Sequence, residues 1–461
     1  MFELNTYVER RRMLAEQVGE GILFFPGNIQ SSMSYKDNHY PFRQDSSFLY
    51  FFGIDLPGLD ATIDAATGET ILYGEEPTED DLVWTGPVTP LTEMAERVGI
   101  KKVRPCVQLH RDLAGLKQKH NRIHWLPPYR PETFLKIQEL LQVEANVVTL
   151  LSSEAFIKAV VRLRSTKSEE EVREIESGVD FTVDMLLLAM KNGAAGIREC
   201  ELASAMHSSV IAKNSQLAFP TILTVHGEIL HNHYSNATVK PGQLILSDCG
   251  AESLMHYAGD MTRTFPADKT FNNQQKEIYQ IVLNSFRHAS GLLSPGILFR
   301  DVHLAACEQL VTGLKELGIF KGDTKDAVAA GAHTLLFPCG LGHMLGLDTH
   351  DMENLGEKYV GYTEELVQSK EFGLKSLRLG RALEEGFVLT VEPGLYFNPF
   401  LMDLWESQKK HVDFINYGAL KKYRDFGGVR VEEDFYITAQ GARKLGKHLP
   451  MEISEIEEYR R

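Results

Sequence analysis

Five residues in the second half of the chain carry side chains that bind hard divalent cations: Asp248, Asp260, His343, Glu392 and Glu432. Four carboxylates gathered in one pocket would repel one another by several kcal/mol each if nothing neutralised them. Two divalent cations supply the four positive charges that such a group needs. The residue types therefore predict a dinuclear metal site if the fold brings the five together.

The two aspartates have a spacing that fits neighbouring strands. An apolar run at 244–247 leads into Asp248, and a hairpin-sized excursion then reaches Asp260, twelve positions later (260 − 248). That spacing excludes a single helix face and fits two adjacent strands. The alternative is that both are ordinary turn residues, because Asp close to Gly is common in turns.

His343 lies in a glycine-containing segment, residues 340–350, that ends in a second histidine, His350. Glycines let the backbone approach a ligand closely, and neutral imidazole is the commonest metal-binding side chain. A histidine among apolar residues can equally be a core residue with its hydrogen bonds satisfied, so this segment alone leaves both interpretations open.

The two glutamates lie at strand ends. Glu392 closes an apolar run at 388–391 and is followed by Pro393 and glycine, which end strand pairing. In the run at 428–434, strand alternation puts Arg430 and Glu432 on the same face. The alternative for that pair is a surface ion pair of little energetic value.

A histidine pair, His231 and His233, precedes the first aspartate. His-x-His without a third nearby ligand is a weak metal signal. A positioning or proton-transfer role is the preferred hypothesis, with a solvated loop as the alternative.

The elements that must position these residues fall into two regions. The first begins with an amphipathic helix at 7–18 and a buried strand at 21–25, and it continues as alternating short strands and helices to about 155, which predicts an α/β domain. Within it, the polar residues at 41–47 precede an aromatic run at 48–53 that is rich in strand formers and predicts a strand.

A polar stretch around 164–171 marks the change to the second region, where Ser168 and Glu171 form a capping box that opens a long helix. We therefore expect domains at 1–160 and 166–461. The second should be α+β, with helices packed on a mostly antiparallel sheet. Its expected helices lie near 169–191, 199–213, 273–290 and 300–317, and its expected strands lie near 243–247, 387–392 and 429–436.

Bulk composition excludes several classes of protein. The chain has 461 residues with 48 Lys plus Arg and 63 Asp plus Glu, and the net charge of −15 disfavours nucleic acid as a partner. No apolar run is long enough to cross a membrane, and the start lacks the apolar core of a secretory signal. The five cysteines are scattered and form no CxxC pair, which fits a reducing cytoplasm better than a disulfide framework or a thiolate zinc site.

Five ordered motifs carry a resemblance to a known family. They are DCGAE at 248–252, YAGDMTRTFP at 257–266, GHMLGLDTH at 342–350, LTVEPG at 389–394 and VRVEED at 429–434. Together they resemble the pita-bread metallopeptidases, above all the Xaa-Pro aminopeptidases (aminopeptidase P), with the Xaa-Pro dipeptidases (prolidases) next. The segment YPFRQDS at 40–46 and the run after it are similar to the aminopeptidase P amino-terminal domain.

The resemblance implies a role for each of the five residues. Asp248, Asp260 and Glu432 would hold one metal, while Asp260, His343, Glu392 and Glu432 would hold the other, so that Asp260 and Glu432 bridge. The family favours Mn²⁺, although Co²⁺ or Zn²⁺ can occupy similar ligands. A hydroxide between the two cations would be the nucleophile, and Glu392 would also move a proton from it to the departing prolyl nitrogen.

Other residues are implied to act on substrate. His233 and His350 would hold it and stabilise the tetrahedral intermediate, with His231 competing for the first role. Arg430 would orient the last carboxylate or contact substrate. Asp37 would lie near the free amine of the substrate. The family's further arginine, Arg378 or Arg381, stays unassigned.

The implied activity is removal of the first residue from peptides with proline in second place, by a cytoplasmic homodimer or homotetramer that acts on neither nucleic acid nor membranes. A prolidase is the alternative, and a metal-free, creatinase-like or non-catalytic member is a third. Two polar stretches, roughly 351–385 and 398–426, separate the motifs and are expected to be surface loops or insertions near the mouth of the site.

Overall fold

The computed structural model describes residues 1–120 and 122–461, and Asn121, inside the predicted first domain, lies outside the described residues. The chain divides into two compact units. Unit 1 comprises Met1–Arg164 and Met352–Tyr359, and unit 2 comprises Ser165–Asp351 and Val360–Arg461. The short segment Met352–Tyr359 thus belongs to unit 1, although the sequence assigned it to the second domain. The predicted ranges, 1–160 and 166–461, stay predictions.

Unit 1 is an α/β unit built on a five-stranded mixed sheet of order β4-β3-β2-β1-β5. Its strands are β1 (Ile22–Pro26), β2 (Asp60–Asp64), β3 (Thr70–Tyr73), β4 (Lys102–Arg104) and β5 (Ile123–His124). The α-helices are α1 (Leu4–Val18), α2 (Ser46–Phe52), α3 (Glu79–Trp84), α4 (Leu91–Arg97), α5 (Leu109–His120), α6 (Pro131–Leu141), α7 (Glu154–Ser165) and α13 (Glu357–Val360), the last two reaching the boundary with unit 2. Short 3₁₀ turns are η1 (Cys106–Gln108), η2 (Ala145–Val147) and η4 (Glu353–Leu355).

The predicted strand at 48–53 is wrong, because this segment is helix α2. Asp45 accepts a hydrogen bond from the Phe48 N–H as the N-cap, and Gly53 ends the helix in the left-handed conformation. Every residue of α2 is buried. A short helix that is buried all round has no polar face, so its sequence cannot be told from that of a buried strand by periodicity.

Unit 2 is α+β, as predicted. Its α-helices are α8 (Glu169–Asn192), α9 (Glu199–Ile211), α10 (Asn273–Leu292), α11 (Phe299–Glu316), α12 (Thr324–Ala329), α14 (Pro399–Ser407), α15 (Tyr417–Leu420) and α16 (Ile453–Tyr459). Its 3₁₀ turns are η3 (Ala332–Leu335), η5 (Leu374–Ser376) and η6 (Lys421–Tyr423). None of the helices in the described residues is both long and apolar enough to span a membrane.

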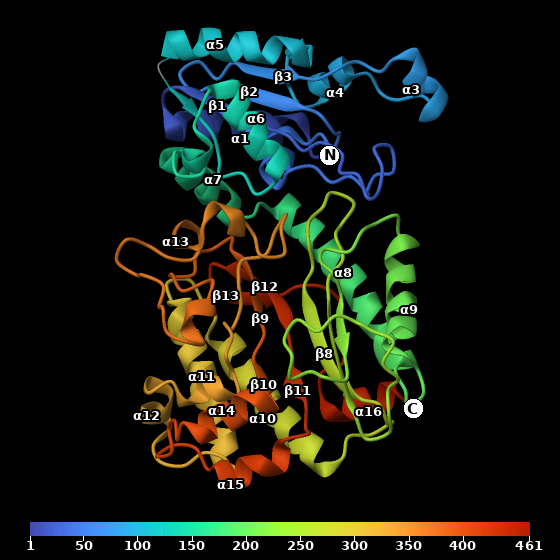
Figure 1. Ribbon diagram of the computed structural model, residues 1–461, viewed down its shortest axis with the longest axis vertical. Coiled ribbons are helices and arrows are strands. Elements are labelled where there is room, and N and C mark those ends of the chain that lie inside the picture. Colours follow the sequence, from blue (N-terminus) through green and yellow to red (C-terminus); the bar gives the residue numbers. More distant parts are fainter. Residues whose placement is uncertain (121) are drawn as a thin grey trace. The chain divides into compact units, whose positions relative to one another are not determined.

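Three antiparallel sheets form the interior of unit 2. One is β6 (Ile222–Thr224), β7 (Leu244–Cys249) and β8 (Met261–Pro266), another is β9 (Val388–Val391), β12 (Glu433–Thr438) and β13 (Gly441–Lys444), and the third is the pair β10 (Gly394–Tyr396) and β11 (Gly428–Arg430). Helix α8 packs against β7 and β8 and is covered by α9, whereas α10 packs against β9 and β10 and is covered by α11 (Figure 1).

The long helix α8 begins where the capping box predicts. The Ser168 hydroxyl accepts a hydrogen bond from the Glu171 N–H, and the Glu171 carboxylate accepts one from the Ser168 N–H. Two N–H groups that a helix end leaves unpaired are thereby satisfied. The helix then runs to Asn192 and packs against both β7 and β8.

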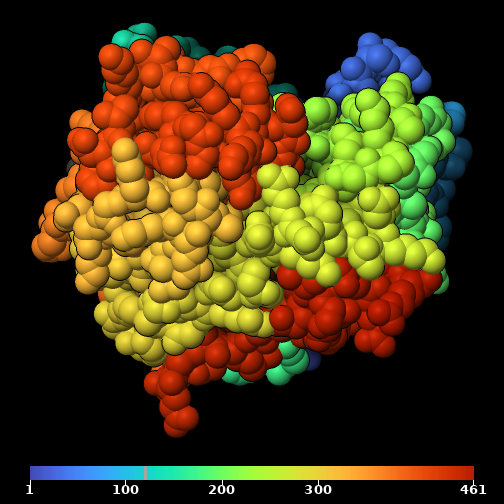
Figure 2. All heavy atoms as spheres, turned by 90° about the horizontal axis from the view of Figure 1, so that it is seen from below, coloured from blue at the N-terminus to red at the C-terminus, as the bar shows by residue number. Residues whose placement is uncertain are grey.

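The stretch at 398–426, expected as a loop or insertion, contains helices α14 and α15. It is tied to the end of α11 through the Lys321 N–H, which donates to the Phe414 carbonyl, and the Asn416 N–H, which donates to the Ile319 carbonyl. Figure 2 shows the orange-red segment at the molecular surface beside the paler orange surface of the α11 and α12 region. The other stretch, 351–385, contains the short helix α13 and the turns η4 and η5.

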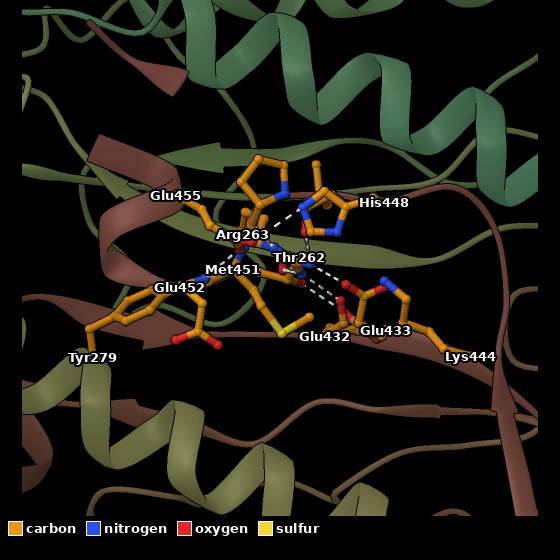
Figure 3. Close-up of polar contacts among 12 residues, drawn as sticks. Thr262, Arg263, Tyr279, Glu432, Glu433, Lys444, His448, Met451, Glu452 and Glu455 are labelled. Carbon is orange, nitrogen blue, oxygen red and sulfur yellow. Dashed lines mark hydrogen bonds and ion pairs between the residues drawn. The ribbon is translucent and has the colours of Figure 1, made fainter. Parts of the chain in front are cut away.

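A buried arginine, Arg263 in β8, joins three segments of unit 2 (Figure 3). Its Nη1 donates to the Glu432 carbonyl and its Nε to the Pro450 carbonyl, each at 2.9 Å. Its Nη2 pairs with the Glu433 carboxylate, and both side chains are 0% exposed. Arg263 thus holds β8 against the start of β12, the two elements that flank Asp260 and Glu432.

We expect Arg263→Met to lower the free energy of unfolding by about 3–5 kcal/mol, because it leaves the Glu433 charge and two carbonyls buried without this donor. Urea denaturation followed by circular dichroism measures the change. The control is Arg287→Met, which removes an ion pair whose side chains are 48% and 38% exposed and should cost about 1 kcal/mol or less. Equal losses in the two variants would contradict the role given to Arg263.

Candidate metal centre

The two predicted aspartates lie at adjoining strand positions. Asp248 is in β7 and Asp260 directly precedes β8, and the register pairs Asp248 with Thr262. The Asp260 N–H donates to an Asp434 carboxylate oxygen at 3.0 Å. Both aspartates are buried, at 8% and 5% exposure. The hairpin anticipated from their spacing therefore brings them to one end of the sheet.

The two predicted glutamates come together through the pairing of β9 with β12. The register sets Val391 opposite Glu433, so Glu392 and Glu432 follow and precede paired residues at one edge. The Glu392 N–H donates to the Leu341 carbonyl at 2.8 Å, and the Glu432 N–H donates to the Thr262 carbonyl at 3.1 Å. These backbone bonds tie the His343 loop and β8 to the same edge.

His343 presents one ring nitrogen to the carboxylates. Its backbone exchanges two hydrogen bonds with Thr390, and its Nδ1 lies 3.0 Å from the Met344 carbonyl. Because a carbonyl can only accept, Nδ1 carries the proton of the neutral ring, and Nε2 is then the nitrogen with the lone pair for a metal. That Nε2 lies 3.4 Å from Asp260 Oδ2 and 3.6 Å from Glu392 Oε1.

The structure thus gathers the five residues that the sequence singled out. Asp260, His343 and Glu432 offer ligand atoms within 4.8 Å of one another, Glu392 adjoins His343, and the charge of Asp248 acts on the same carboxylates. Oxygen-rich ligands with one imidazole suit hard or borderline divalent cations. Their function as ligands is the proposal developed below.

The raised pKa values of the carboxylates show that the cluster needs positive charge to stay ionised. Burial raises the pKa of Asp248 to about 7, with the Arg430 charge opposing this and the Asp260 and Glu392 charges adding to it. Burial also raises the pKa of Glu392, and it raises that of Glu432 well above its ordinary value. Asp248 Oδ1 is buried and has no hydrogen-bond partner. The residues fit a group of divalent cations.

Arg430 lies beside Asp248 instead of beside the last carboxylate. Its Nη2 pairs with Asp248 Oδ2, its Nη1 donates to the Tyr396 hydroxyl at 2.9 Å and its Nε donates to Thr262 Oγ1 at 3.0 Å. Glu432 Oε2 accepts from the same threonine hydroxyl at 2.6 Å. The single strand expected near 429–436 is wrong, because Arg430 ends β11, Glu432 lies in the break before β12, and the two strands belong to different sheets. Arg430 and Glu432 both contact Thr262 Oγ1, but Arg430 orients the first carboxylate directly.

The predicted substrate residues have different settings. The His350 ring meets the His343 ring edge to face, with centroids 4.3 Å apart. His233 is exposed and forms an isolated β-bridge with Ile222, the β6 residue paired with Asp248. The pKa of His231, the other candidate for its role, is lowered by burial and by the Arg430 charge.

Two further assignments remain untested. Asp37 is exposed in a turn of unit 1, and its function stays a prediction. Of the two unassigned arginines, Arg378 acts on Glu392 through its charge, whereas Arg381 donates to Ser165.

Sequence reasoning missed Thr262, Thr264 and Asp434, which support the predicted ligands. Thr264 Oγ1 exchanges hydrogen bonds with the backbone of Arg430, and Thr262 serves both Arg430 and Glu432. The signal was present, because alternation from Asp260 puts Thr262 and Thr264 on the ligand face. Asp434 lies two positions beyond Glu432 and could have been found in the same way.

Comparisons with known proteins identify the family. The sequence model of metallopeptidase family M24 matches residues 152–439, and that of the aminopeptidase P N-terminal domain matches residues 7–124. The chain therefore belongs to metallopeptidase family M24. This confirms the resemblance read from the five motifs, and membership implies divalent metal ions.

Relatives and solved structures agree over nearly the whole chain. A probable Xaa-Pro aminopeptidase of Metarhizium robertsii is 30% identical over 443 residues, 95% of this chain and 91% of that protein. The Xaa-Pro dipeptidase of Homo sapiens is 29% identical over 465 residues, 97% of this chain and 90% of that one. Aminopeptidase P from Escherichia coli with the inhibitor Pro-Leu aligns with a TM-score of 0.82 and 26% identity, covering 100% of this chain and 98% of that one. A zinc-substituted form of that enzyme in complex with product matches equally well. The expected fold, an α/β domain followed by a pita-bread domain, is confirmed.

We expect divalent cations to raise the melting temperature of the protein more at pH 8 than at pH 5. A carboxyl whose folded pKa is raised, as for Asp248 from 3.8 to about 7, stabilises the metal-free fold fully below pH 3.8, and this stabilisation is lost as the pH rises through 7. Cations offset that loss, and protons compete with them at low pH. Thermal melts with and without Mn²⁺ at matched ionic strength measure the difference.

The matched control for this prediction is Asp248→Asn, which removes the titrating group. In this variant the gain in melting temperature that cations cause should differ less between pH 5 and pH 8. An equal gain in melting temperature at pH 5 and pH 8 in the unmodified protein would contradict the electrostatic account.

Proposed function

We propose that this protein is a metal-dependent Xaa-Pro aminopeptidase, which releases the first residue of peptides whose second residue is proline. The observation that carries the proposal is a cluster of four carboxylates and one imidazole in a chain of family M24, all buried except the half-buried Glu392. The aminopeptidase P N-terminal domain at 7–124 and the relatives named Xaa-Pro aminopeptidase support the substrate class. An Xaa-Pro bond has no N–H, so proteases that grip an extended backbone handle it poorly.

The proposed cofactors are two divalent cations, with Mn²⁺ the first expectation and Co²⁺ or Zn²⁺ the alternatives. Asp248, Asp260 and Glu432 would hold one, and Asp260, His343, Glu392 and Glu432 the other. The raised carboxyl pKa values and the partnerless Asp248 oxygen support four ionised carboxylates balanced by four positive charges. When bound, the cations lower the pKa of a water molecule and polarise the scissile carbonyl.

Within this proposal Glu392 is the proton carrier. Its side chain is 20% exposed, against 7% for Asp260 and 12% for Asp248, so among these three it is the most open to a substrate. Its pKa is raised by burial, which suits a carboxyl that accepts a proton from water and gives it to the departing prolyl nitrogen.

The remaining proposed residues orient groups or bind substrate. His350, which contacts the His343 ring, and His233, beside the strand paired with β7, would hold the substrate and stabilise the tetrahedral intermediate. Arg430 would keep the Asp248 carboxylate oriented through their ion pair. Asp37 would contact the free amine of the substrate.

We also propose a cytoplasmic homodimer or homotetramer that acts on peptides and on neither nucleic acid nor membranes. Cysteines without disulfides support the reducing compartment, and the net charge of −15 supports the absence of a polyanionic partner. Sedimentation of the purified protein tests the oligomeric state.

A prolidase is the second candidate, favoured by the 29% identity to the human Xaa-Pro dipeptidase. A metal-free or non-catalytic member is the third, and it is disfavoured because all five ligand-type residues are kept and gathered. Peptide length decides between the first two, since the same ligands serve both.

The reconstituted enzyme should release arginine from Arg-Pro-Pro and leave Gly-Pro intact, because an aminopeptidase accommodates the chain beyond proline. Metal-free protein is loaded with Mn²⁺, Co²⁺ or Zn²⁺ in turn, and chromatography measures the free amino acids released from each peptide. Cleavage of dipeptides alone would favour the prolidase. Protein that contains no transition metal by elemental analysis and gains no activity from any of the three cations would refute both enzymes.

Variants should separate ligands from substrate residues. Asp260→Ala and Glu432→Ala are expected to lose both bound metal and turnover, because these residues would bridge the cations. His350→Ala should keep its metal and lose rate by about 10²–10⁴-fold, the usual contribution of a positioned proton-transfer or oxyanion group. Metal content by mass spectrometry and kcat on Arg-Pro-Pro are measured together. Equal loss of metal in all three variants would mean that His350 has been assigned to the wrong group.

A further inference from the structure

A second group of metal-binding side chains lies in unit 2, outside the five residues above. Within the described residues, His303, Cys307 and His333 bring three ligand atoms within 4.8 Å of one another. His303 and Cys307 are one turn apart on α11, and His333 is on η3. All three are buried, at 1%, 0% and 3% exposure.

The helical pair already has the separation of two ligands on one ion. His303 Nε2 lies 3.6 Å from Cys307 Sγ. With the bond lengths known for zinc, about 2.0–2.1 Å to nitrogen and about 2.3 Å to sulfur, the two ligand atoms lie about 3.6 Å apart at a tetrahedral angle and about 3.8 Å apart at the trigonal angle of a three-ligand site. The same distance also fits a weak hydrogen bond from the Cys307 S–H to the His303 nitrogen. A metal site therefore needs a second observation in its support.

That observation is a set of buried ring nitrogens without hydrogen bonds. His303 Nδ1 and both nitrogens of His333 have no hydrogen-bond partner. A buried polar atom that forms no hydrogen bond is costly and rare, and it calls for a missing partner. The Val328 carbonyl slightly favours a charged His333 ring but does not satisfy either nitrogen. A cation held between these residues would take one of the two unpartnered His333 nitrogens, while His303 would bind it through the Nε2 atom that faces Cys307.

The protonation states suit a thiophilic cation. Burial lowers the pKa of His303 to about 3 and that of His333 to about 4, so both rings are neutral at physiological pH and keep a free lone pair. Burial raises the pKa of the Cys307 thiol well above its ordinary value, so the thiol gives up its proton only when a cation replaces it.

We propose that His303, Cys307 and His333 form a buried site for one thiophilic cation, and that this cation is Cu⁺. Two imidazoles and a thiolate are ligands for both Cu⁺ and Zn²⁺. With one thiolate the site is neutral around Cu⁺ and carries +1 around Zn²⁺, a charge that is costly to bury. Binding forms one metal–sulfur bond and releases one proton to solvent.

The surface segment at 398–426 gains a function in this proposal. Helix α14 packs against η3, and the Trp405 ring lies 5.4 Å from the ring of His411, whose charge acts on His333. Figure 2 shows this segment at the surface beside the paler orange region of α11 and α12. Because α14 packs on the turn that carries His333 and all three side chains are buried, the ion would be structural and would exchange slowly.

The test is anaerobic titration of the protein with Cu⁺ in competition with the colorimetric ligand bicinchoninate. We expect one equivalent bound in an Asp260→Ala background, where the carboxylate cluster is disabled, with one proton released. X-ray absorption should find one sulfur and two nitrogen neighbours. Cys307→Ala and His333→Leu should each weaken Cu⁺ binding by more than about 100-fold, beyond the loss that changes to outer partners cause. Cys200→Ala, which removes another thiol outside the cluster, should leave it unchanged.

Other results overturn the proposal or its ion. Unchanged Cu⁺ affinity in Cys307→Ala, or a copper neighbourhood without nitrogen, would overturn the site. Tight Zn²⁺ binding that depends on Cys307 and His333, with no such Cu⁺ binding, would support the site and overturn the choice of ion. Where a variant loses its circular dichroism spectrum, the absorption experiment on the otherwise unmodified protein decides. Peptidase activity is not a readout, so this outcome is independent of the proposed function.

Discussion

The gathering of three buried carboxylates and the half-buried Glu392 around one imidazole is the constraint on which the rest of unit 2 depends. Left alone, the group raises its own pKa values, that of Asp248 to about 7, and resists ionisation. The fold tolerates the cluster because its strands supply fixed donors: the Thr262 hydroxyl to Glu432, the Arg430 guanidinium to Asp248 and the Asp260 N–H to Asp434. The donors offset part of the negative charge of the carboxylates, and divalent cations would offset the rest. The structure of the site and its need for metal therefore have the same electrostatic cause.

Strand alternation divides the supporting work between two faces. On β8, Thr262 and Thr264 face the ligands, while Arg263 between them turns away and pairs with Glu433. The buried ion pair and the carbonyls that Arg263 bonds hold the strands in register. The positions of the ligand residues on one face of β8 therefore depend on the Arg263–Glu433 ion pair on the other face.

The second buried cluster obeys the opposite chemistry. The carboxylate site collects hard oxygens and total charge, whereas His303, Cys307 and His333 combine neutral nitrogens with a thiol in apolar surroundings. Hard divalent cations and thiophilic monovalent cations are selected by such contrasts in ligand type. One domain can thus hold two kinds of ion without either site competing for the other's.

The sequence by itself determined the four long helices of unit 2 (α8 to α11), the antiparallel hairpin and the identity of the five gathered residues, because capping residues, alternation and charge are local properties. It did not determine α14 and α15, which lie in a stretch expected to be a loop or insertion. It misassigned α2, since a short helix buried on every side has no pattern of its own. Thr262 was within reach of alternation, but the pairing of Arg430 with Asp248 across 182 positions was not. His303 and Cys307 are spaced for one helix face, yet only the folding of η3 against α11 brings His333 to them. Only the tertiary structure decided those contacts, because they join segments far apart in the chain, and separation in sequence does not determine separation in space.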